Sequence, residues 1–116
     1  MTPVSVVTYR ESEGEAFREG CERRIVHTSQ LMTVLLEVTN GPWASPDPYH
    51  SHPHEQTTFI AEGELLFLVE GDPPRHLSAG DLVAIPGGRP HAMQLLSARA
   101  TLVDSFSPVR EDFLKS

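Results

Sequence analysis

The sequence predicts an all-β fold, a small sandwich or closed barrel, and three observations support this prediction. Ten prolines and eight glycines are spread through 116 residues, which leaves little room for long helices. Between them lie short runs rich in Val, Ile, Leu and Thr, the residue types that favour strands. These runs number about eight to ten, and turn residues separate them, a spacing typical of sandwiches and barrels. The length matches one domain, so we expect residues 1–116 to form a single domain.

Seven of these expected strands can be located by residue range, and each ends near Gly, Pro, Asp or Ser. In chain order they are Glu22–Thr28, Gln30–Thr39, Thr57–Ala61, Leu65–Val69, Asp81–Ile85, Ala92–Leu96 and Ala100–Phe106. The dipeptide Glu62-Gly63 predicts a hairpin turn between the third run and the fourth. Only Arg110–Lys115 favours a helical turn, and Glu11–Glu22 is expected to be a solvated acidic stretch.

Charge and cysteine content exclude several classes of partner. The formal net charge of −7 argues against nucleic acid and anionic membrane surfaces, which attract Lys- and Arg-rich faces. Cys21 is the single cysteine, so the chain has no disulfide framework and a cytoplasmic location is expected. The apolar stretch Ile25–Leu36 is far shorter than the roughly 20 residues of a membrane-spanning helix. Met1–Tyr9 lacks the basic region of a signal peptide. These features favour a small-molecule partner.

A cluster of histidines is the main chemical feature of the sequence. His50, His52 and His54 lie within five residues. Alternate side chains of a strand share a face, so we expect His50 and His52 to point the same way. Two imidazoles at this separation suit a metal ion, with metal–nitrogen bonds of about 2.1 Å. Gln56 has the same parity, and His91 adds a fourth imidazole at the end of a tight turn. Three imidazoles and one amide oxygen would hold a divalent ion and leave coordination positions open.

An isolated HxH pair also occurs by chance, so the residues alone leave a metal site and a pair of ordinary histidines as alternatives. His54 is either a further ligand or a group that contacts substrate. His27 and His76 have no partners in the pattern and are expected to be surface or hydrogen-bonded structural residues.

Two motifs in order resemble the signatures of the cupin family. The first runs Gly41…His50-Ser51-His52-x3-Gln56-x6-Gly63, and the second runs Gly80-x5-Pro86-Gly87-Gly88-Arg89-Pro90-His91, sixteen residues further on. The resemblance implies a small double-stranded β-helix, that is, a jelly-roll barrel. It also implies one divalent transition metal ion per chain, and a homodimer, since the family usually forms dimers. The implied ligands are His50, His52, Gln56 and His91.

The sequence departs from the family pattern at two positions. The commoner family residue at the position of Gln56 is Glu, and a neutral ligand there should leave the ion more electrophilic. The Asn often found after the second-motif histidine is replaced by Leu95, which is not a ligand position. The sequence leaves the identity of the ion open among Ni, Zn, Fe, Mn and Co.

The C-terminal segment contains a second set of candidate residues. If Leu102–Phe106 is a strand, Asp104 and Phe106 share a face with Leu102. An interior carboxylate is costly unless it is paired, linked to a metal or functional. Arg110 follows and is able to bind a carboxylate bidentately. The alternative is an exposed Asp104 and an Arg110 that pairs with a neighbouring Glu or Asp, and the residues alone do not decide between them.

The runs HSHPHEQ, PGGRPH and DSFSPVREDF together resemble the small single-domain cupins of pectin and alginate breakdown, the KdgF type. These proteins convert cyclic 4,5-unsaturated uronates into linear ketonised sugars. The similarity implies that Asp104 is the acid or base and that Phe106 and Arg110 shape the site for an anionic sugar. Two alternatives stay open: an Fe-dependent dioxygenase on the same scaffold, and a non-catalytic small-molecule binding or sensing module.

Overall fold

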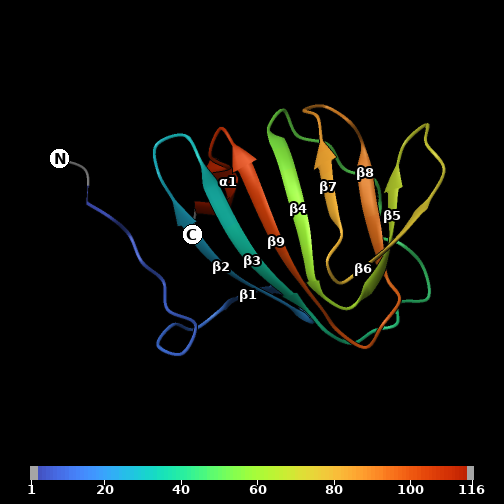
Figure 1. Ribbon diagram of the computed structural model, residues 1–116, viewed down its shortest axis with the longest axis horizontal. Helices are drawn as coiled ribbons and strands as arrows, with labels where there is room; N and C mark the ends of the chain where they lie inside the picture. The colour runs from blue at the N-terminus through green and yellow to red at the C-terminus, as the bar shows by residue number, and fades with distance from the viewer. Residues whose placement is uncertain (1–2, 115–116) are drawn as a thin grey trace.

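A computed structural model describes residues 3–114 and contains two β-sheets, whose strands are labelled in Figure 1. The larger sheet has the strand order β1-β2-β3-β9-β4-β7, and the smaller has the order β6-β5-β8. All pairings are antiparallel. The strands are β1 (Glu15–Arg18), β2 (Cys21–His27), β3 (Met32–Val38), β4 (Glu55–Glu62), β5 (Glu64–Val69), β6 (Arg75–Ser78), β7 (Leu82–Ile85), β8 (His91–Leu95) and β9 (Ala100–Ser107). The predicted all-β jelly-roll fold is confirmed.

Apolar side chains from the inner faces of both sheets form the core. On β9 the burial pattern alternates strictly, and the inward residues include Leu102, Asp104 and Phe106. One cluster joins the sheets through Ile60, Leu65, Phe67, Ile85 and Leu102. Each buried side chain of this size contributes about 1.5–3 kcal/mol by leaving water.

Two of the described strands lie outside the seven runs that were located in the sequence. The strand β1 lies within the predicted acidic stretch Glu11–Glu22, and all four of its residues are exposed, as a solvated segment should be. The strand β6 also has no buried residue. Both are edge strands, so they lack the apolar alternation by which strands are predicted. The predicted helical turn is α1 (Glu111–Leu114), and Lys115 lies outside the described residues. Within residues 3–114 no helix is long and apolar enough to cross a membrane.

The predicted hairpin at Glu62-Gly63 is wrong. The strands β4 and β5 flank Gly63 but belong to different sheets, so the chain turns a corner there. Gly63 has a φ of 95°, and a side chain at this position would collide with the backbone of Arg99 and Ala100. Close packing at the corner therefore requires glycine.

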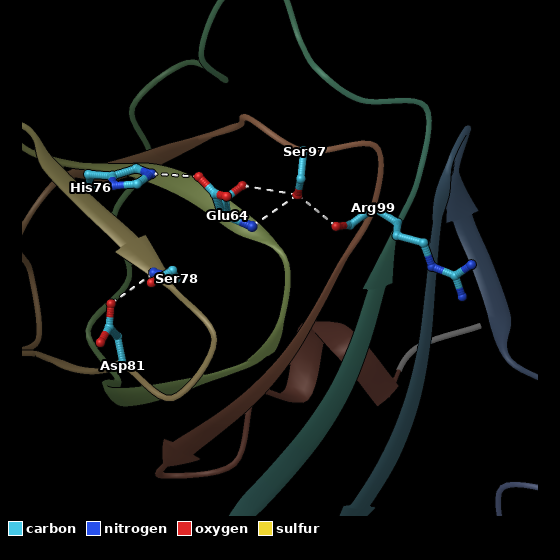
Figure 2. Close-up of polar contacts among 6 residues, drawn as sticks. All are labelled: Glu64, His76, Ser78, Asp81, Ser97 and Arg99. Carbon is cyan, nitrogen blue, oxygen red and sulfur yellow. Dashed lines mark hydrogen bonds and ion pairs between the residues drawn. The ribbon is translucent and has the colours of Figure 1, made fainter.

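Polar contacts fasten this corner (Figure 2). The backbone N–H of Glu64 donates to Ser97 Oγ at 2.9 Å, and Ser97 Oγ donates to the carbonyl of Arg99 at 2.8 Å. The Glu64 carboxylate lies 3.0 Å from His76 Nε2. Because Ser97 contacts the backbone of Glu64 and not its carboxylate, the three side chains are not a nucleophilic triad. His76 is hydrogen-bonded and exposed, as predicted.

Candidate metal centre

Backbone pairing brings the two sequence motifs together. His50 and His91 form an antiparallel bridge, with N–H to carbonyl distances of 3.0 and 2.9 Å. The Gly88 N–H donates to the His52 carbonyl at 2.8 Å. A side chain at Gly87 would collide with the carbonyl of Pro53, so this glycine permits the close approach of the two loops. The histidines of both motifs therefore meet at one place.

Three imidazoles converge there. The rings of His50 and His91 have centroids 4.3 Å apart, and His52 lies 5.0 Å from His91. One nitrogen from each ring lies within 4.8 Å of the others, an arrangement that could hold a metal ion. We expected His50 and His52 to be alternate residues of one strand, and this prediction is wrong: His50 forms an isolated bridge, and His52 lies in the loop that follows. Pro53, which has no N–H for a ladder, explains why strand pairing ends there.

The protonation pattern of the rings fits a cation. His91 Nδ1 lies 2.7 Å from the Arg89 carbonyl and so carries the proton, which leaves the lone pair on Nε2. That nitrogen is buried and has no hydrogen-bond partner among residues 3–114. Similarly, His52 Nδ1 lies 3.1 Å from the His54 carbonyl, and its Nε2 faces Gln56 Oε1 at 3.0 Å. His52 Nε2, Gln56 Oε1 and His91 Nε2 therefore each direct a lone pair to the same place. A cation bound there would satisfy all three atoms.

Burial keeps the rings of His50 and His52 neutral. Burial, together with the neighbouring His91 and His52, lowers the pKa of His50 to about 4. Burial also lowers the pKa of His52, and the positive charge of Arg110 acts in the same direction. Neutral imidazole is the form that binds metals, so His50 and His52 are ready for a ligand role at neutral pH.

A hydrogen-bonded chain connects the histidines to Asp104. From Gln56 on β4, Nε2 donates to Thr58 Oγ1 at 3.0 Å, and Thr58 Oγ1 donates to Asp104 Oδ1 at 2.7 Å. The ionised carboxylate only accepts, so the Thr58 proton points to Asp104 and its lone pair accepts the Gln56 amide. Consequently Gln56 must present Oε1 toward His52, which is the orientation a metal ligand needs.

Thr58 was missed by sequence reasoning, although it has the same strand parity as Gln56. The side chain is buried beside Asp104, its partner across the β4–β9 pair. A buried hydroxyl at an inward position two residues after a candidate ligand was the available signal.

Asp104 is an interior carboxylate, 9% exposed, on the strand between β3 and β4. Burial raises its pKa to about 6, and the hydrogen bond from Thr58 and the charge of Arg110 oppose that rise. A carboxyl group with this pKa exchanges protons readily near neutral pH. Of the two alternatives for Asp104, the exposed strand end is excluded.

The aromatic and cationic candidates lie in the same cavity as Asp104. The cavity has a volume of about 340 Å³ between the two sheets, and both Phe106 and Arg110 line it. Phe106 is buried, and its ring packs edge-on against His52 at 5.7 Å. Arg110 pairs with Asp112, through Nε at 3.3 Å and Nη2 at 2.7 Å, and its guanidinium lies over the Phe113 ring. Arg110 therefore forms the ion pair with a neighbouring acid that one alternative predicted. It also lines the cavity, as the other alternative required.

His54 is not one of the three histidines whose nitrogens converge. Its ring lies 5.5 Å from that of His52, and its half-buried side chain has an Nδ1 without a partner in the described part of the chain. His27 is exposed, with Nδ1 near the Thr28 carbonyl, as predicted for a surface histidine.

Comparisons with known proteins identify the family of this chain. A family profile described as the cupin domain matches residues 34–104. Pectin degradation protein KdgF of Dickeya dadantii is 32% identical over 106 residues, which are 90% of this chain and 93% of that protein. The solved structure of KdgF from a Halomonas species superposes with a TM-score of 0.83 at 29% identity, covering 94% of this chain and 99% of that one.

A second relative is similar over a shorter length. Dimethylsulfoniopropionate lyase DddQ of Ruegeria pomeroyi is 56% identical over 45 residues, which are 39% of this chain and only 22% of the lyase. The chain thus matches about a fifth of that protein. Since the family profile covers more than half of the residues and the KdgF match covers nearly all of them, this chain belongs to the cupin family.

Proposed function

We propose that this cupin opens the ring of 4,5-unsaturated uronate sugars with the help of one divalent transition metal ion. The observation that carries the proposal is the chain of hydrogen bonds from the three-histidine cluster to a buried carboxyl group in one cavity. The similarity to two KdgF proteins, one of them named for pectin degradation, points to the same class of substrate.

The proposed ligands are the side chains of His50, His52, Gln56 and His91. Imidazole nitrogen and amide oxygen suit Ni, Zn, Fe, Mn and Co, and geometry alone does not select among them. When bound, the ion supplies Lewis acidity toward the oxygens of the sugar. Gln56 adds no charge, so the full positive charge of the ion acts on the substrate.

Asp104 is the proposed acid and base. In its protonated form it donates a proton to C4 of the C4=C5 bond, and water then adds at C5 and returns a proton to the carboxylate. The resulting hemiketal loses its C5–O5 bond, so the ring oxygen gains a proton and C5 becomes a ketone. The C1 hydrate releases the water again, and the net reaction is an isomerisation to a linear sugar. A pKa near 6 allows Asp104 to work in both directions.

Phe106 and Arg110 complete the proposed site. Phe106 forms a rigid apolar wall beside His52, which limits how a sugar can lie against the ion. Arg110 contributes positive charge next to Asp104 and favours an anionic substrate in a protein of net charge −7.

The test is an assay of the metal-loaded protein on unsaturated galacturonate, guluronate and mannuronate. The conjugated C4=C5 bond absorbs in the ultraviolet, so ring opening is followed as loss of that absorbance above the spontaneous rate. We expect turnover that disappears on chelation and returns with metal. No acceleration by protein with a stoichiometric ion would refute the proposal.

A second candidate is a lyase reaction on dimethylsulfoniopropionate, favoured by the 56% identity with DddQ over 45 residues. The same preparation is therefore assayed for release of dimethyl sulfide. Oxygen uptake with the iron-loaded protein tests the dioxygenase alternative. Binding of a uronate without conversion would favour a binding module.

We also propose that residues 1–116 form one cupin domain that works as a homodimer in the cytoplasm. An uncharged row of partly exposed side chains crosses the outer face of the larger sheet and supports the dimer; it consists of Leu35, Val103, Phe59 and Leu82. Sedimentation of the purified protein tests the dimer: a mass of one chain at micromolar concentration would refute it.

A further inference from the structure

An arginine on β2 faces the interior of the barrel. Arg23 pairs with Leu36 across the β2–β3 ladder, and its strand neighbours on the same face, Cys21 and Ile25, pack in the core. The Arg23 side chain is 12% exposed and lines the cavity that contains Asp104. A positive charge at such a position is unfavourable unless an anion accompanies it.

The surroundings of Arg23 hold its guanidinium group by one edge. Nε donates to Glu15 Oε1 at 2.7 Å, and this glutamate is 56% exposed. The guanidinium carbon lies 4.5 Å from the ring centroid of Phe17 and 4.3 Å from that of Phe113. These contacts order the planar group, and its hydrogen atoms point outward within its own plane. Among residues 3–114 no hydrogen bond is made by the terminal nitrogens Nη1 and Nη2.

The other two arginines of the cavity differ. Arg18 binds Asp47 through both terminal nitrogens, at 3.3 and 2.8 Å. Arg110 binds Asp112 through Nε and Nη2. Within the described chain, Arg23 is thus the cavity arginine whose terminal pair of nitrogens is free, and such a pair matches the two oxygens of a carboxylate.

We propose that Arg23 binds the carboxylate of an anionic sugar through Nη1 and Nη2 and so determines the preference of the cavity for uronates over neutral sugars. This assignment rests on the proposed function and adds the residue that recognises the acid group. The aromatic groups beside the guanidinium and the apolar cavity walls reduce access of water and strengthen such an ion pair.

Arg24 provides a matched control. It is the next residue of β2, its side chain is also 12% exposed, and it forms an ion pair with Glu37 at 2.9 Å. It contacts Tyr9 and Ser12 and does not line the cavity. Arg23→Gln and Arg24→Gln therefore each remove one partly buried, paired charge from the same strand, on opposite faces.

The experiment measures binding of D-galacturonate and D-galactose to the metal-loaded protein by calorimetry. These saturated sugars are not converted and differ in the carboxylate. For Arg23→Gln we expect affinity for galacturonate to fall by about 10- to 100-fold, the value of a charged hydrogen-bonded contact, with no change for galactose. Arg24→Gln should bind both sugars as the wild type does. Arg23→Lys keeps the charge but not the fork, so part of the galacturonate affinity should return.

Three results would overturn the assignment: equal effects of Arg23→Gln and Arg24→Gln, equal loss of both sugars, or a wild type that does not prefer galacturonate. If Arg23→Gln does not fold, the test uses Arg23→Lys. A role of Arg23 in packing alone predicts that Arg23→Lys loses the same affinity for both sugars.

The KM for unsaturated uronates distinguishes failure of the Arg23 assignment from failure of the proposed ring-opening reaction. Turnover by Arg23→Gln with an unchanged KM would refute the role of Arg23 and leave the proposed reaction standing. If galacturonate binding depends on Arg23 but unsaturated uronates are not turned over, the proposed reaction is refuted and the role of Arg23 stands.

Discussion

Substitution of Thr58 by Val tests the link between the proposed metal ligands and Asp104. Valine has nearly the same shape as threonine but neither donates nor accepts a hydrogen bond. The change removes the bond to Asp104 at 2.7 Å and the bond from Gln56 at 3.0 Å. Both lost partners are in the protein interior, and leaving a buried polar group unpaired costs about 1–3 kcal/mol. Thr58→Val should therefore destabilise the metal-free protein by about 2–6 kcal/mol.

The same substitution frees the Gln56 amide to rotate away from the ligand orientation. Loss of a hydrogen-bonding partner behind a metal ligand typically lowers metal affinity or activity by about 10- to 100-fold. The hydrogen bond from Thr58 also lowers the pKa of Asp104, so that pKa should rise in the variant. The assays are competition with a chromophoric chelator, urea unfolding, and carbon NMR titration of the Asp104 carboxyl.

Two variants make the result interpretable. Thr58→Ser keeps the hydroxyl and should retain wild-type metal affinity. Thr57→Val changes the neighbouring, exposed threonine of β4 and should leave metal affinity and the Asp104 pKa unaltered. If Thr58→Val binds metal as tightly as Thr57→Val does, the derived orientation of Gln56 is wrong.

Four further outcomes concern the proposed ligands and Asp104. Metal at about 100 times its dissociation constant should stabilise the protein by roughly 2.7 kcal/mol in thermal unfolding; His50→Ala, His52→Ala or His91→Ala should abolish most of this gain, and a full gain in all three would refute the site. Gln56→Glu should bind metal as tightly or more tightly but turn over more slowly, because a negative ligand reduces Lewis acidity; unchanged kcat would contradict this. Asp104→Asn should keep metal and lower turnover of an unsaturated uronate by at least ~100-fold, and full activity would eliminate the acid–base role. Since the folded pKa of Asp104 is raised to about 6, its contribution to stability is complete below about pH 4 and is lost as pH rises through 6. The free energy of unfolding of the metal-free wild type, measured in urea, should therefore fall by about 2 kcal/mol relative to Asp104→Asn between pH 4 and pH 7, and parallel pH profiles would disprove it.

The sequence by itself determined the features that depend on short-range spacing. All seven predicted strands begin and end within two residues of an observed strand, because alternation of apolar side chains is a local property of an extended backbone; the observed strands are β2, β3, β4, β5, β7, β8 and β9. The strand β3 begins two residues later than predicted, because Thr28 and Leu31 form a turn before it, and it ends one residue earlier. The motif spacing likewise identified the three histidines that the fold brings together.

Only the tertiary structure decided which distant segments meet. Glu62-Gly63 looks like a hairpin in isolation, yet the strands on either side gain more from pairing with β9 and β8, which follow later in the chain. Thr58 and Asp104 are 46 residues apart, and their hydrogen bond exists because β4 and β9 pair in one particular register. Arg23 occupies an ordinary charged position in the sequence and becomes a cavity residue only when β2 turns that face inward. Strand register and pairing result from the burial of the whole core, so no local pattern contains them.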